Sequence, residues 1–191
     1  YSIVGIPLAH YSETGNRTRI ITICVALWSA ATALSGMVAP VQVGGVVISG
    51  FVMMLICRVL VGVGEAGCTP PANSMIADYY PASRRSTAFG YYAMGVTAGT
   101  LLANLIGGPV TDALGWRAAF IVIGFAGVIV SIVFRLTVKE PPRGYSDPPG
   151  VTRPERASFA VAIREMSSKP SFWLMAAAAM LSSFCAYGIT T

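Results

Sequence analysis

Arg58 and Glu65 are opposite charges in an otherwise apolar stretch, and their types and spacing could do chemistry. Seven positions apart, they project from one face of a helix, about 10.5 Å apart along its axis. Each charge near a bilayer centre costs about 3 kcal/mol, and such residues typically face a bundle interior or a watery cavity. Gly62 lies on the same face, and Thr69 continues it. We predict a polar cavity for a substrate or proton; the alternative is that the two charges only tie helices together.

A glycine pattern in the same stretch offers a different interpretation. Gly62-Val63-Gly64-Glu65-Ala66-Gly67 matches the fingerprint of dinucleotide-binding loops. Such a loop follows a short strand and opens a soluble helix within a βαβ unit. Here a long apolar stretch precedes the pattern, and Pro70-Pro71 follows it closely. We therefore favour a membrane helix and expect no cofactor.

The composition favours a helical membrane protein. Of the 191 residues, 54% are hydrophobic and 11% are charged, whereas soluble domains have roughly 25% charged residues. The charges fall in clusters between uncharged runs that can each hold most of a membrane span. The four cysteines lie in apolar runs without a close Cys or His partner, so no metal site is expected. We predict an all-α bundle with the tail of one helix and about five spans, at residues 1–10, 20–40, 51–79, 86–110, 118–134 and 171–191.

Three details of these segments can be tested. Residues 41–50 are expected to form a loop or a frayed helix start. Pro70-Pro71 is expected to interrupt the second span, because proline removes a backbone hydrogen bond. The connection at 112–117 is so short that the spans on either side should be antiparallel neighbours.

The basic residues predict the orientation in the membrane. Eleven of the 13 Lys and Arg fall in three polar segments, at 11–19, 80–85 and 135–170. The positive-inside rule makes these segments cytoplasmic, and orientation explains the net charge of +5 better than a nucleic-acid partner does. We expect a multi-pass protein of the bacterial inner membrane. Its parts would be a membrane unit at 1–137, a cytoplasmic loop at 138–170 with a surface helix within 156–168, and a second membrane unit from 171 to 191.

Small residues recur along the third predicted span. Gly95, Gly99, Ala103 and Gly107 are four positions apart and form a ridge on which another helix could pack closely. Gly107-Gly108-Pro109 should weaken the helix near its outer end. Tight static packing and a hinge are both compatible with this pattern.

Several motifs together resemble a known family. YSETGNRTR follows a helix end, RVLVGVGEAG precedes the polar turn DYYPASRR, and GGPVTDALGWRAAF and TVKEPPRG come later. In this order they resemble the major facilitator superfamily. The stretch RVLVGVGEAGCTPPANSMIADYYPASRR resembles the spinster-like branch, whose eukaryotic members move lysolipids and sphingosine phosphate.

The resemblance implies a protein of twelve helices in two halves, with this chain running from the end of the second helix into the seventh. The first residue is Tyr1 and the last lies in an apolar run, so we expect a piece of a larger protein. Cargo would pass between the halves by alternating access. Arg58 and Glu65 would line that path. A cytoplasmic gate would consist of Glu13, Arg17, Asp78 and Arg85, with Glu13 in place of the family's usual Asp.

We therefore expect a secondary active transporter of a small amphipathic or organic-anion solute, coupled to protons. Its partners would be the substrate, the lipid bilayer and the remaining helices of the same full-length chain. One alternative is a remnant that does not transport and only packs against other helices. The least favoured alternative is a membrane enzyme, because the single histidine, His10, lies at a helix end and is expected to be an interface residue.

Overall fold

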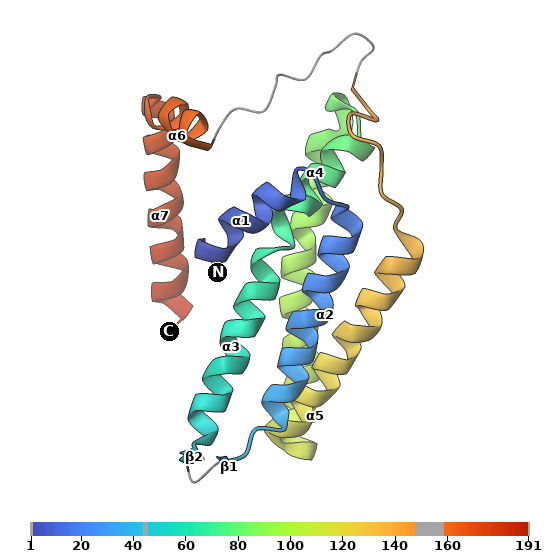
Figure 1. Ribbon diagram of the computed structural model, residues 1–191, viewed down its shortest axis with the longest axis vertical. Coiled ribbons are helices and arrows are strands. Elements are labelled where there is room, and N and C mark those ends of the chain that lie inside the picture. The colour runs from blue at the N-terminus through green and yellow to red at the C-terminus, as the bar shows by residue number, and fades with distance from the viewer. Residues whose placement is uncertain (1, 44–45, 148–158, 191) are drawn as a thin grey trace. The chain divides into compact units, whose positions relative to one another are not determined.

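The computed structural model describes residues 2–43, 46–147 and 159–190, which form two compact units, Tyr1–Asp147 and Pro148–Thr191. The boundary between the units falls inside the predicted loop at 138–170. The predicted helical membrane fold is confirmed, since almost all described elements are helices (Figure 1). The first unit contains α1 (Ser2–Ser12), α2 (Arg17–Gly36), β1 (Val41–Val43), β2 (Val46–Ile48), α3 (Gly50–Ala66), α4 (Thr69–Tyr79) and α5 (Ala82–Thr137).

Three helical stretches of this unit are long and apolar enough to cross a membrane. They are Arg17–Gly36, Gly50–Tyr79 and Ala82–Thr137. Side chains close the first turns of two of these helices: the Asn16 side chain accepts a hydrogen bond from Arg19 N before α2, and Ser49 accepts one from Val52 N before α3. Both helices therefore begin directly after a polar residue whose side chain satisfies an amide of the first turn.

The second span is broken by two residues that precede its prolines. Gly67 and Cys68 separate α3 from α4, while Pro70 and Pro71 lie in the first turn of α4. A proline in a first turn removes no helical hydrogen bond, because those amide groups have no partner within the helix. The predicted interruption of the span is therefore present, and it lies at Gly67 and Cys68, directly before the prolines, which begin the next helix. The fingerprint glycine Gly62 lies inside α3, half-buried, and opens no helix.

A short hairpin joins α2 to α3. The strands β1 and β2 pair antiparallel, with Val41 opposite Ile48 and Gln42 opposite Val47. The expected loop or frayed start at 41–50 was thus incomplete, because alternating valines there form strands. Residues 44 and 45 lie outside the described residues.

The helix α5 consists of two arms that meet at Gly115, where φ is 80° and ψ is 162°. This backbone conformation is essentially restricted to glycine. Figure 1 shows the arms running in opposite directions, which agrees with the antiparallel neighbours predicted from the short connection. Pro109 lies within the helical part of α5, so the departure from helical geometry comes at Gly115 and not at Gly107–Pro109.

The tightest packing in the unit lies between α2 and the second arm of α5. A side-chain carbon on Gly124 would collide with Ala33, and one on Gly127 would collide with Ser29. The predicted ridge behaves differently, because nothing within the described residues lies close to Gly95, Gly99 or Gly107. Close packing in this unit thus uses glycines of the second arm, and also Gly64 and Gly67 of the glycine pattern, which lie against Cys24 of α2.

The second unit contains α6 (Phe159–Ser167) and α7 (Pro170–Thr190). The indole Nε1 of Trp173 donates a hydrogen bond to the Ser167 carbonyl at 2.9 Å, which links the start of α7 to the end of α6. The described part of α6 falls within the predicted surface helix at 156–168, and residues 156–158 lie outside the described part of the chain.

Candidate functional site

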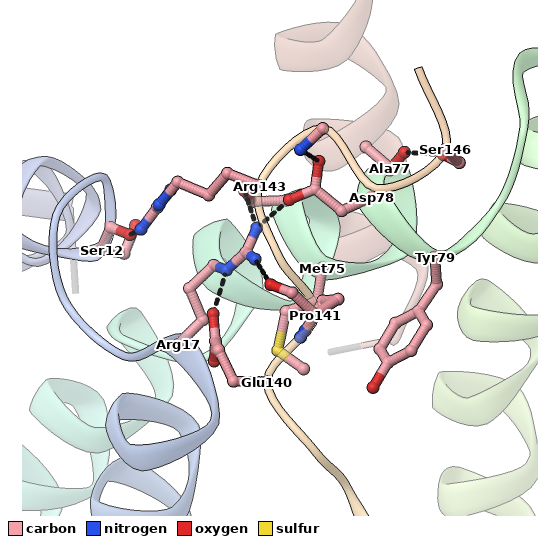
Figure 2. Close-up of polar contacts among 12 residues, drawn as sticks. Ser12, Arg17, Met75, Ala77, Asp78, Tyr79, Glu140, Pro141, Arg143 and Ser146 are labelled. Atoms are coloured by element: carbon pink, nitrogen blue, oxygen red, sulfur yellow. Dashed lines mark hydrogen bonds and ion pairs between the residues drawn. The ribbon is translucent and has the colours of Figure 1, made fainter. Parts of the chain in front are cut away.

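Arg17, the first residue of α2, is fully buried, with none of its side chain exposed. Its Nη1 donates to Asp78 Oδ2 of α4 at 2.5 Å and to Ser74 Oγ at 2.9 Å. Its Nε donates to Glu140 Oε1 at 2.7 Å, and Nη2 donates to the Pro141 carbonyl at 2.9 Å (Figure 2). A buried guanidinium needs such partners, because a buried charge without them is strongly unfavourable. We call Arg17, Asp78 and Glu140 the charge cluster.

Glu140 lies just after α5 and closes the start of α2. Its Oε2 accepts hydrogen bonds from Thr18 N at 2.8 Å and from Thr18 Oγ1 at 3.1 Å. Burial of Glu140 favours the neutral acid, but the bonds from Thr18 and from Arg17 outweigh it and hold the pKa of Glu140 below its usual value. Glu140 is therefore a carboxylate at neutral pH.

Residues 138–147, here called the strap, continue from α5 across the same end of the unit. Arg143 Nη2 donates to the carbonyls of Ser12 and Gly15, at 2.9 and 3.1 Å. Gly144 N donates to Asp78 Oδ1 at 3.0 Å, and Ser146 Oγ donates to the carbonyls of Ala77 and Tyr80, at 3.1 and 2.9 Å. The strap therefore joins the turn after α1, the end of α4 and the end of α5.

The structure places the four predicted gate residues at one end of the first unit. Arg17 and Asp78 form a direct ion pair. Arg85 lies beside them: it donates to the Ala77 carbonyl at 2.7 Å, and its Nη2 is 3.6 Å from Asp147 Oδ1. Glu13 is mostly exposed, and its Oε2 is 3.7 Å from His10 Nδ1.

Sequence reasoning missed Glu140 and Arg143, which complete the site. Both belong to the motif TVKEPPRG, which contributed only to the family resemblance. The sequence pattern that could have revealed them is a pair of opposite charges flanking Pro141-Pro142. The pair comes directly after an apolar span, on the side where Arg17 and Asp78 also lie. The adjacent prolines stiffen the segment that carries both side chains.

The predicted substrate residues have open surroundings. Arg58, Glu65 and Thr69 are all exposed within the described part of the chain. The Arg58 guanidinium lies over the Phe120 ring, 4.7 Å from its centroid, which is a cation–π contact with the second arm of α5. The charges of Arg58 and Glu65 are thus exposed on an apolar helix, whereas Arg17 is buried.

Comparisons with known proteins agree with this architecture. Residues 1–191 match the model of the family described as Major Facilitator Superfamily. An MFS-type efflux pump of Mycolicibacterium smegmatis is 29% identical over 197 residues, covering 100% of this chain and 41% of that protein. Human protein spinster homolog 1 is 30% identical over 179 residues, covering 91% of this chain and 32% of the relative.

A solved structure gives a similar result. It is the crystal structure of a bacterial homolog to the human lysosomal transporter spinster, in an inward-facing and unoccupied conformation. It superposes with a TM-score of 0.70 and 37% sequence identity, covering 99% of this chain and 43% of that chain. The present chain thus spans less than half the length of each of these relatives. It is an integral multi-pass membrane protein, and it belongs to the Major Facilitator Superfamily, with spinster proteins among its similar relatives.

Proposed function

We propose that this chain is part of a secondary active transporter that moves a small amphipathic or organic-anion solute by alternating access, coupled to protons. Arg58 would attract an anionic group of the solute, and Glu65 would carry the proton or contact the polar head. Thr69 would add a hydroxyl, although it begins α4 and does not continue the face of α3 as the sequence predicted. The family match and the names of the relatives support transport. The solute and the proton are inferred from the residues on α3.

The observation that carries this proposal is the open surroundings of Arg58 and Glu65. The bundle encloses Arg17 with carboxylate and carbonyl partners, but it leaves both charges of α3 exposed on an apolar helix. Charges at this depth normally face a bundle interior or a water-filled cavity. The face that carries them is therefore suited to line a path for a polar group.

The charge cluster is proposed to act at a cytoplasmic gate, together with Glu13 and Arg85. It joins the ends of α2, α4 and α5 on the side that carries most of the basic residues, which supports a cytoplasmic assignment. An ion pair that breaks in one conformation would bias the equilibrium between two transporter states by a few kcal/mol. We also propose the bacterial inner membrane as its location, because two of its similar relatives are bacterial.

Transport by the full-length protein in proteoliposomes tests the substrate residues. Thermal shift against lysolipids, sugar acids and drug-like cations would first identify a ligand. Uptake of that ligand, driven by an imposed pH gradient, should then be lost in Arg58→Ala and in Glu65→Gln. Arg164→Gln removes an exposed charge from α6 and serves as the matched control.

Full gradient-driven uptake by both α3 variants would refute the site assignment. Uptake that survives but no longer depends on the pH gradient in Glu65→Gln would assign the proton to that residue. If the wild-type full-length protein transports none of the ligands that it binds, the transport proposal itself fails.

A further inference from the structure

An apolar slot lies at the end of the first unit that carries the charge cluster. It has a volume of about 200 Å³ and lies between α2, α4 and both arms of α5. Its walls include Ile21, Met75, Tyr79, Tyr92, Phe134 and Val138. None of the proposed substrate residues lines it, so the slot is separate from the proposed transport path.

A second pocket, with polar and basic walls, adjoins the slot. It has a volume of about 400 Å³ and shares Tyr79 and Val138 with the slot, adding Tyr80, Thr137 and Lys139. The Tyr79 hydroxyl donates to the Lys139 carbonyl at 2.5 Å, so the slot wall holds the backbone that carries the lysine. We call this second cavity the headgroup pocket. A third pocket shares Tyr80 with it and is lined by Arg84.

Two basic side chains line the headgroup pocket and the pocket next to it. Lys139 and Arg84 are both exposed. Three carboxylates near these cations face other arginines: Asp78 and Glu140 bind Arg17, and Asp147 lies 3.6 Å from Arg85. Figure 2 shows the Tyr79 side chain pointing away from Arg17 and Asp78. Lys139 and Arg84 thus line two pockets that share Tyr80.

We propose that the slot and the headgroup pocket bind one anionic phospholipid of the surrounding membrane. One acyl chain occupies the slot, and the phosphate lies at Lys139, with Arg84 as a second cation across Tyr80. The exposed tyrosines Tyr79, Tyr80, Tyr91 and Tyr92 mark this level as the membrane–water interface, where a headgroup lies. The bound lipid would join α2, α4 and the arms of α5 at the end where the strap is anchored.

Headgroup charge should dominate the selectivity of this site. An acyl chain gains little on moving from the bilayer into the slot, because lipid tails are as apolar as the side chains that line it. A basic residue near an anionic headgroup, in contrast, contributes an attraction that corresponds to about fivefold in affinity. The slot therefore fixes where the acyl chain lies, and the cations select lipids with a negatively charged headgroup.

Native mass spectrometry of the purified full-length protein tests this proposal. Phosphatidylglycerol and phosphatidylcholine with identical chains would be titrated separately. Phosphatidylglycerol should bind more tightly, and Lys139→Gln and Arg84→Gln should each weaken its binding about fivefold. Arg19→Gln removes an exposed cation of α2 that lines none of these pockets, so it is the matched control and should not change the affinity.

Equal affinity for the two lipids would overturn the proposal, and so would an equal loss in Arg19→Gln, which would indicate unspecific charge attraction. Glycerol phosphate, a headgroup without chains, should not displace the lipid; displacement would refute the role of the slot. Arg58→Ala should bind phosphatidylglycerol as the wild type does. Lipid binding and transport can therefore fail independently of each other.

Discussion

Arg17 and Arg58 both belong to the first unit, but their surroundings are opposite. Arg17 has no exposed surface and donates to two carboxylates, a hydroxyl and a carbonyl. Arg58 is exposed and lies over the ring of Phe120. A guanidinium with so many fixed partners holds the ends of the helices together. An arginine displayed on an apolar helix remains available for a group that comes from elsewhere.

The comparison also shows how a charge can be buried at low cost. The charge cluster receives further hydrogen bonds from Thr18 to Glu140 and from Gly144 to Asp78. Buried ion pairs are favourable only when their remaining hydrogen-bonding capacity is satisfied. The cluster meets this condition by using backbone groups of the strap and of α2, so the strap is as much a part of the site as the helices are.

The largest effect on stability is expected from Arg17→Met. The change leaves Asp78 and Glu140 enclosed without their cation, and breaking a buried pair costs about 3–5 kcal/mol. Chemical unfolding of the full-length protein in mixed micelles would measure the loss. Arg19→Met, which removes an exposed charge two residues further on, should change the free energy of unfolding by about 0.5 kcal/mol or less. An equal loss of unfolding free energy in both variants would show that Arg17 does not hold the ends of the helices together.

Protonation of Glu140 at acidic pH should remove part of the stabilisation that the charge cluster provides. Because the folded protein holds the pKa of Glu140 below its usual value, ionisation of this group stabilises the fold at neutral pH. That contribution is lost as the pH falls below about 4.5, the usual carboxyl value, and through the lowered pKa. Melting temperatures measured between neutral and acidic pH should therefore fall more steeply for the wild type than for Glu140→Gln.

Glu165→Gln is the control for the acid prediction, since Glu165 is an exposed carboxylate of α6. This variant should keep the wild-type pH profile. An identical profile for Glu140→Gln and the wild type would contradict the stabilising role assigned to Glu140.

Arg58→Met is expected to have a smaller effect on stability than Arg17→Met. It removes the cation–π contact with Phe120, which is worth about 0.5–1 kcal/mol at an exposed site. The same unfolding measurement applies, and Phe120→Leu should cause a similar loss through the same contact. A loss as large as that of Arg17→Met would remove the difference between the two arginines.

Glu65→Gln should have the smallest effect. The side chain is exposed, so neutralising it should change the free energy of unfolding by about 0.5 kcal/mol or less. Circular dichroism and unfolding curves in the same micelles should therefore coincide with those of the wild type. Destabilisation by more than about 2 kcal/mol would favour the interpretation that Glu65 ties helices together.

The sequence predicted the helical spans well because the physics behind them is local. Long runs without charge indicate membrane helices, and clustered basic residues indicate which turns share a side. The grouping of Arg17 with Asp78, which the structure places in direct contact, came instead from the family resemblance.

The remaining features depend on contacts between distant segments. Glu140 and Arg143 act through α2 and the turn after α1, more than a hundred positions earlier, and no local pattern shows that pairing. Gly124 and Gly127 carry the close packing because Ala33 and Ser29 happen to face them. Pro70 and Pro71 could be interpreted as a break or as a helix start, and only the position of Gly67 and Cys68 decides between the two.

The anchored strap limits how far the chain that follows it can extend. A free segment adds roughly 3.3–3.6 Å of reach per residue, but the residues from Glu140 to Ser146 are already bound to α1, α2 and α4. A force applied at Asp147 must therefore detach these contacts before it can move the strap. A pull on the connecting chain would thus be transmitted mechanically to Arg17.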